Sequence, residues 1–218
     1  MTAITMDGEA LAAEVKADLA VRMGVLAEAG ITPGLGTILV GEDGPSAKYV
    51  AMKHRDCADL GMHSVDVRLP ADASQARVDA AVDELNASDE VHAFIVQYPF
   101  PGGLDYEAAI LRVDPAKDAD GLHPTNLGHL VMGVEAPLAC TPAGILAMLS
   151  AYEVPVAGRI DLVRSGAEER GSSHELESPT FSRGWGARGP RALAHSPRSG
   201  NRVCAFSALT LCGVAQVP

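Results

Sequence analysis

The sequence lacks any apolar stretch long enough to cross a membrane. A transmembrane helix needs about 18 or more consecutive uncharged, mostly apolar residues, and no segment of the 218-residue chain reaches that length. The first residues, Met1 to Ala10, carry Asp7 and Glu9 instead of the basic start of a secretory signal. We therefore expect a cytoplasmic protein that does not associate with membranes.

Basic residues and paired cysteines are also scarce. The chain has 17 Lys and Arg against 28 Asp and Glu, a formal net charge of −11. Proteins that bind nucleic acid through its phosphates usually carry the opposite charge, so nucleic acid is not an expected partner. The 4 cysteines form no CxxC pair and have no histidines at zinc-binding spacing. The sequence thus predicts neither disulfides nor a metal site, and we expect reduced thiols.

What the chain does have, up to about residue 150, is an alternation of helical and strand-like patterns. Apolar residues recur at helical spacing in the first segment, and short apolar runs bounded by Gly or polar turns follow. Ser46 and Thr141 look like N-caps of two of the helices. Helices are expected over 6–29, 46–60, 74–86 and 141–152, and strands over 34–41, 64–69 and 92–96. This order predicts an α/β fold, an open and mostly parallel sheet with helices on both faces.

The pattern fails from Ile160 onward. Residues 168–202 are rich in Ser, Gly, Arg and Pro, and all four lysines of the chain precede them. We therefore divide the chain into a domain at 1–159 and a tail at 160–218 that we expect to be poorly ordered. A natural disordered tail and an out-of-frame reading of GC-rich DNA would both give this composition.

A tyrosine and a lysine stand four residues apart in the second predicted helix. Tyr49 and Lys53 would project from one helical face about one turn apart, where they could act together. The alternative is a solvated lysine beside a half-buried tyrosine.

A carboxamide follows the third predicted strand. Gln97 opens a loop that Pro99 and Pro101 stiffen, at the strand end where open α/β sheets bind ligands. An ordinary exit from the strand is the plainer interpretation.

Charged and amide residues then gather over 114–128, a segment for which we predict little regular structure. Such loops are often functional sites, and Asp120 is among the candidates. A solvated acidic turn is the alternative, whereas a calcium-binding EF-hand loop lacks its spaced oxygen ligands and terminal glutamate. Cys140 has no partnered histidine, which argues against a nucleophile.

Together the four segments resemble the signatures of the methylenetetrahydrofolate dehydrogenase/methenyltetrahydrofolate cyclohydrolase family. The matching motifs are YVxxK at 49–53, VQxPxP at 96–101, PxKDxDGxHxxNxG at 115–128 and CTPxG at 140–144. The likeness spans about residues 5–159. Tyr98, Phe100 and Ala119 depart from the residues usual in the family, and these are changes of packing.

The resemblance implies roles for particular residues. Lys53 would be the central catalytic residue, Tyr49 would pack along the folate rings, Gln97 would bond Lys53, and Asp120 would hold the pterin, with Pro99 lining the substrate site. It also implies tetrahydrofolate substrates, NADP as cofactor, a homodimer and a part in one-carbon metabolism and purine biosynthesis.

The family's NADP-binding domain is not recognisable in residues 160–218. Arg164-Ser165-Gly166 stands at compressed spacing and no helical pattern follows to bind a phosphate. We therefore expect no dehydrogenase activity from this chain. Two hypotheses stay open: a family enzyme whose second half was lost through a frameshift or misprediction, and a folate-binding remnant that is catalytically incomplete.

Overall fold

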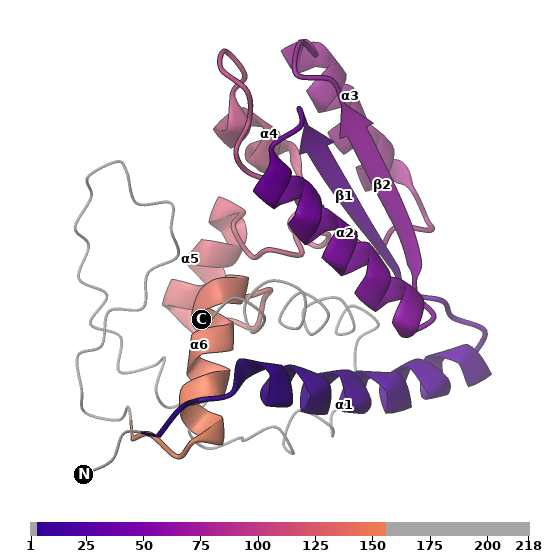
Figure 1. Cartoon of the computed structure of the whole chain (residues 1–218). Coiled ribbons are helices and arrows are strands. Elements are labelled where there is room, and N and C mark those ends of the chain that lie inside the picture. The colour runs from indigo at the N-terminus through magenta and orange to yellow at the C-terminus, as the bar shows by residue number, and fades with distance from the viewer. Residues whose placement is uncertain (1–3, 156–218) are drawn as a thin grey trace.

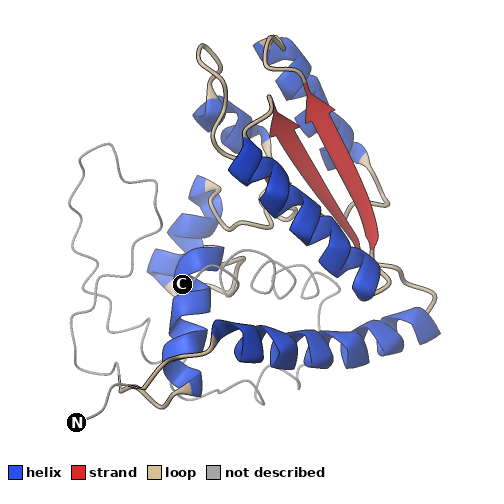
Figure 2. Cartoon of the chain, in the orientation of Figure 1, coloured by secondary structure: helices blue, strands red, loops and turns tan. Residues whose placement is uncertain are grey.

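A computed structural model describes residues 4–155, which form a parallel three-stranded sheet with six helices around it (Figures 1 and 2). The strands pair in the order β2-β1-β3. In chain order the elements are α1 (Gly8–Glu28), β1 (Gly34–Val40), α2 (Gly44–Asp59), β2 (His63–Leu69), α3 (Gln75–Ala87), β3 (Ala93–Val96), α4 (Tyr106–Arg112), α5 (Pro124–Met132) and α6 (Cys140–Ala151).

The central strand β1 explains why the sheet needs cover on both faces. All 7 of its residues are buried, and alternate side chains point to opposite faces of a strand. Ile38 and Val40 pack in one apolar cluster with α3 and α4, whereas Leu35 packs in another with Cys57 of α2. In Figure 1, α2 covers the near face and α3 the far face. The predicted α/β class and parallel sheet are therefore confirmed.

Two further helices pack against each other beside the sheet. Leu11 of α1 and Met148 of α6 are the buried centre of a small apolar cluster. The start of α1 lies against α6, and the other end of α1 lies below the amino ends of the strands (Figure 1). Lys16 of α1 makes an ion pair with Asp56 of α2. This contact ties α1 to the helix that carries the lysine-tyrosine pair.

Several local predictions were wrong. The side chain of Asp43, not Ser46, caps α2 by accepting from the Ser46 N–H, and α6 begins at Cys140 with no side-chain cap from Thr141. The helix α4 lies in a stretch for which we predicted no element, and α5 begins inside the segment 114–128, for which we predicted little regular structure.

The predicted tail at 160–218 lies outside the described residues. Within 4–155, no helix combines the length and the apolar character that a membrane crossing demands.

Candidate active site

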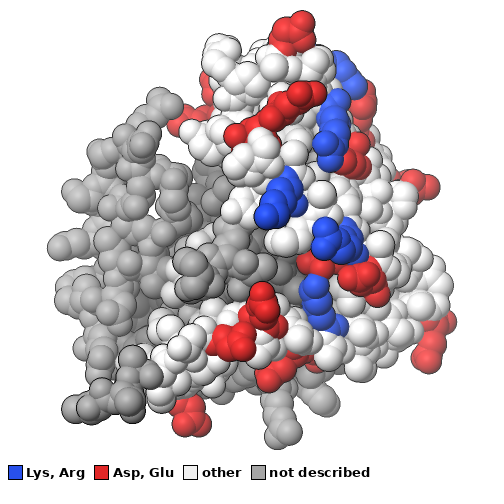
Figure 3. Space-filling view, viewed as in Figure 1, with Lys and Arg blue, Asp and Glu red and all other residues white. Residues whose placement is uncertain are grey.

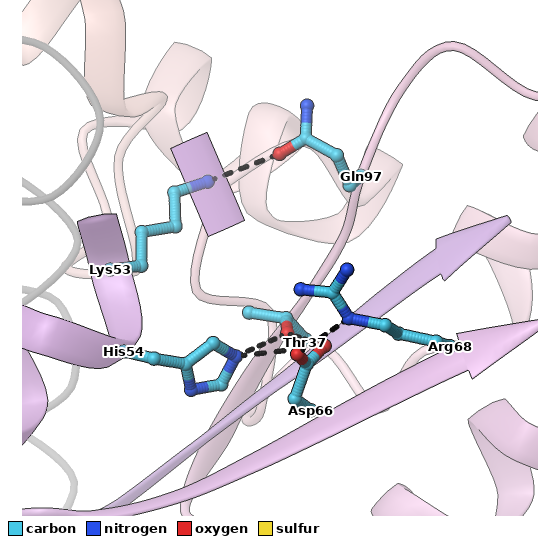
Figure 4. Close-up of polar contacts among 6 residues, drawn as sticks. All are labelled: Thr37, Lys53, His54, Asp66, Arg68 and Gln97. Carbon is cyan, nitrogen blue, oxygen red and sulfur yellow. Dashed lines mark hydrogen bonds and ion pairs between the residues drawn. The ribbon is translucent and has the colours of Figure 1, made fainter. Parts of the chain in front are cut away.

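The buried amine of Lys53 is the centre of the candidate site. Lys53 lies on the sheet-facing side of α2 and is only 3% exposed. Its Nζ donates to Oε1 of Gln97 at 3.3 Å (Figure 4). Burial of a charged amine is costly, and here a neutral carboxamide, not a carboxylate, is its hydrogen-bond partner.

The loop after β3 fixes the Gln97 carboxamide. The Gln97 backbone N–H donates to the Ile38 carbonyl at 2.9 Å, which extends the sheet by one residue. Its side-chain Nε2 donates to the Tyr98 carbonyl at 2.7 Å. Because Nε2 is held there, Oε1 is turned toward Lys53. The peptide bond between Tyr98 and Pro99 is cis, and Pro99 is exposed.

The same loop contacts α2 one turn before the tyrosine. The buried Ser46 hydroxyl donates to the Tyr98 carbonyl at 3.2 Å. Tyr49 follows on that face of α2, half-buried, and Lys53 comes one turn later. Ser46, Tyr49 and Lys53 therefore share one face of α2, and Ser46 and Lys53 contact the loop. We call this line of contact between α2 and the loop the seam.

Asp120 lies beside β3, on the side of this strand that faces away from β1. The residues just before it run beside β3: the Phe94 N–H donates to the Lys117 carbonyl at 2.9 Å, and the Ala119 N–H donates to the Phe94 carbonyl at 3.2 Å. This pairing is parallel, so the chain continues toward the end of β3 from which Gln97 emerges. Asp120 is half-buried there.

A second polar group, which sequence reasoning missed, lies beside Lys53. His54 points from α2 to the sheet, with Nε2 2.9 Å from the Thr37 hydroxyl and 3.8 Å from the Asp66 carboxylate (Figure 4). Arg68 donates to Asp66 at 2.8 Å. The one available signal was the polar Thr37 within an apolar strand.

Burial lowers the pKa of His54, while the Asp66 carboxylate opposes this and the charges of Arg68 and Lys53 add to it. The unfolded chain therefore binds a proton more readily than the folded chain once the pH falls below about 6.5. We expect the free energy of unfolding to fall with pH from about 7 toward 5, and less so in His54→Gln. Chemical denaturation at several pH values measures this. An equal dependence of the free energy of unfolding on pH in the parent and the His54→Gln protein would contradict this prediction.

Charge on the surrounding face is mixed in spite of the net negative charge. Figure 3 shows Lys and Arg side chains interspersed with Asp and Glu over the face that α2 covers in Figure 1. Two of the ion pairs of this region are Lys16 with Asp56 and Arg68 with Asp66. Opposite charges are therefore paired locally on α1, α2 and β2 near the site.

The two cysteines within residues 4–155 are both buried, and neither forms a disulfide. Burial, helped by the neighbouring Asp56 charge, raises the pKa of the Cys57 thiol to about 11. The Cys140 thiol donates to the Ala119 carbonyl at 3.3 Å and contributes to packing beneath the loop. Neither thiol has the exposed, electropositive setting of a nucleophile.

A hollow of about 500 Å³ opens elsewhere, at the ends of β1 and β2. The residues that line it are Leu39, Gly41, Glu42, Ala47, Arg68, Leu69 and Pro70. Lys53 and Gln97 do not contribute to it, so the hydrogen-bonded seam, not this hollow, is the candidate site.

An open parallel sheet with a buried lysine, hydrogen-bonded to a carboxamide near the strand ends, is typical of α/β enzyme domains. Residues 6–120 match the family described as tetrahydrofolate dehydrogenase/cyclohydrolase, catalytic domain. The chain belongs to this family.

Solved structures support the assignment. A bifunctional methylenetetrahydrofolate dehydrogenase/cyclohydrolase, FolD, from Campylobacter jejuni is 36% identical with a TM-score of 0.69, over 72% of this chain and 57% of that one. The Trypanosoma brucei enzyme, solved with NADP and an inhibitor, is 32% identical with a TM-score of 0.70, over 72% and 55% of the two chains. The match thus spans little more than half the length of these relatives.

Proposed function

We propose that this chain binds tetrahydrofolate derivatives and hydrolyses 5,10-methenyltetrahydrofolate to 10-formyltetrahydrofolate. The observation that supports this most strongly is the hydrogen bond from buried Lys53 to Gln97 at 3.3 Å. Opening the methenyl bridge needs the loss of a proton from the attacking water and the gain of a proton by a ring nitrogen, and an amine that can gain and lose a proton suits both.

The proposed steps use the residues of the seam. Water adds to the electron-poor methenyl carbon, and the Lys53 amine takes the proton that the water oxygen releases. Lys53 then returns a proton to the ring nitrogen at position 5 as its bond to the carbon breaks. The carbon stays on the nitrogen at position 10 as a formyl group. Its hydroxyl oxygen loses the second water proton as the C=O bond forms, and this is the one proton released overall.

Gln97, Tyr49 and Asp120 bind and orient in this proposal. Gln97 can hold the amine whether it is charged or neutral, because the amide oxygen accepts and adds no charge. The Tyr49 ring offers a flat surface to the folate rings. The Asp120 carboxylate can accept two parallel N–H bonds from the amino-oxo edge of a pterin. The backbone near Pro99 borders the same seam.

The Trypanosoma brucei relative binds NADP, and we infer NADP as the cofactor of the family's oxidation step. In this chain Gly41 and Gly44 flank the turn from β1 to α2. Glu42 and Asp43 fill that turn, and Asp43 caps the helix. The negative charge of these two side chains would repel a phosphate, so this turn does not suit NADP. The proposed hydrolysis requires no NADP.

The test is a hydrolysis assay of the purified 218-residue chain with 5,10-methenyltetrahydrofolate, followed by the loss of its absorbance. Hydrolysis well above the rate in buffer, saturating with substrate, supports the proposal. A rate equal to the buffer rate, with the protein folded by circular dichroism, would reject it. The chain would then still belong to the family, but without this activity.

A further inference from the structure

A second aspartate, Asp118, is buried two residues before Asp120. It is 5% exposed, and three N–H groups donate to its carboxylate. Oδ1 accepts from the Gly121 backbone at 3.0 Å, and Oδ2 accepts from the His123 backbone at 2.8 Å and from Asn126 Nδ2 at 2.9 Å. The three hydrogen bonds compensate the free-energy cost of burying the Asp118 charge, and removing the carboxylate would leave the three N–H groups without an acceptor.

These hydrogen bonds fix the backbone on both sides of Asp120, because they join Asp118 to residues that follow Asp120. Gly121 has φ +67°, and a Cβ atom there would lie 2.3 Å from the Leu138 carbonyl carbon, so only glycine fits. The Cys140 N–H donates to the Asp120 carbonyl at 3.3 Å. The backbone of Asp120 is thus held between the edge of β3 and the segment that leads into α6.

The donors to Asp118 are themselves anchored. Asn126, 3% exposed, also donates to the Pro115 carbonyl at 2.9 Å, which closes the loop on its other side. His123 caps α5: its Nδ1 accepts from the Thr125 N–H at 3.1 Å, so its proton lies on Nε2, which faces the Leu111 carbonyl at 3.4 Å. Asp118 therefore connects the β3 edge to the first turn of α5.

We propose that Asp118 is a positioning residue that fixes the direction of the Asp120 carboxylate, and through it the affinity for the pterin. The inference rests on the proposed function, because it takes Asp120 as the group that binds the pterin. Asp118 itself touches no substrate. Lys53 and Gln97 belong to α2 and the loop after β3, so the rate of the chemical step is expected to change little when Asp118 is altered.

Asp118→Asn tests this with almost no change in shape. Donors face both carboxylate oxygens, so the new NH₂ group opposes a donor in either orientation of the amide. We expect tetrahydrofolate to bind about 10-fold more weakly, with KM raised by a similar factor and kcat within about twofold. Titration calorimetry under reducing conditions and the hydrolysis assay measure these quantities.

A double-mutant cycle with Asp120→Asn separates positioning from general loosening. If Asp118 acts through Asp120, Asp118→Asn has little further effect on affinity in the Asp120→Asn protein. A full additional loss in that background would overturn the inference, as would unchanged affinity in Asp118→Asn alone.

Asp114→Asn is the matched control. Asp114 is exposed in the same loop and accepts one backbone N–H, from Ala116 at 2.9 Å, so affinity should not change. If circular dichroism shows that Asp118→Asn does not fold, Asn126→Ala replaces it, with an expected loss of about threefold, and unchanged affinity there overturns the inference. A parent protein that binds no tetrahydrofolate refutes the proposed function itself, whereas binding that is insensitive to Asp118 refutes only this inference.

Discussion

Lys53→Met should reduce the hydrolysis of 5,10-methenyltetrahydrofolate by about 10³-fold, within the range of general acid–base catalysis. Methionine has a similar length and fills the buried space that the lysine stem occupies, 3% exposed on α2. It cannot take a proton from water or return one to the ring nitrogen. Affinity for tetrahydrofolate should change by less than about threefold, since Tyr49 and Asp120 remain. Steady-state kinetics and calorimetry check the two numbers.

Lys48→Met is the control for this change. Lys48 is exposed on the same helix, so its replacement removes one positive charge without touching the seam. We expect kcat to stay within about twofold of the parent value. Equal losses of turnover and affinity in Lys53→Met would show that the lysine mainly binds substrate, which contradicts the proposed division of labour.

Strands and site motifs were predictable for the same reason: each has a local signal. A continuous apolar run such as 34–40 is typical of a strand buried on both faces, and β1 is such a strand. Tyr49 and Lys53 share a helical face by spacing alone. The bond from Lys53 to Gln97, however, joins residues 44 positions apart. It was expected from the family resemblance, because no local pattern encodes it.

The missed features depend on tertiary context. The helix α4 has 7 residues and buries one of them, Ala109, so its apolar periodicity is too short to detect. The helix α5 begins after a histidine cap, which is an uncommon N-cap residue. At the start of α2, Asp43 and Ser46 are both residues that favour an N-cap. Which of the two caps the helix depends on where the chain leaves β1, and in the structure it is Asp43.

The two aspartates at 118 and 120 show the same limit at the site. Both stand in one short polar run, and the sequence offers no way to tell which is buried. The hydrogen bonds that Gly121, His123 and Asn126 donate to the Asp118 carboxylate decide this, because they hold Asp118 buried inside the folded loop. The site residue and its support are therefore distinguished by how the loop folds, which the order of the residues alone does not show.

Asp120→Asn should weaken tetrahydrofolate binding by roughly 100-fold, equivalent to about 3 kcal/mol. The carboxylate is expected to accept two parallel N–H bonds from the pterin. The amide keeps the shape but turns one acceptor into a donor, so one pterin N–H loses its partner and meets another donor.

Calorimetry with tetrahydrofolate measures the affinity directly, and Asp89→Asn is the control, since Asp89 is exposed in the turn before β3, at the opposite end of that strand from Asp120. Because the Lys53 amine is intact, kcat at saturating substrate should fall far less than kcat/KM. An Asp120→Asn protein with parental affinity but lost turnover would reverse the roles proposed for Asp120 and Lys53. The carboxylate would then belong to the proton-transfer step, and the pterin would have to be held by other groups of the seam.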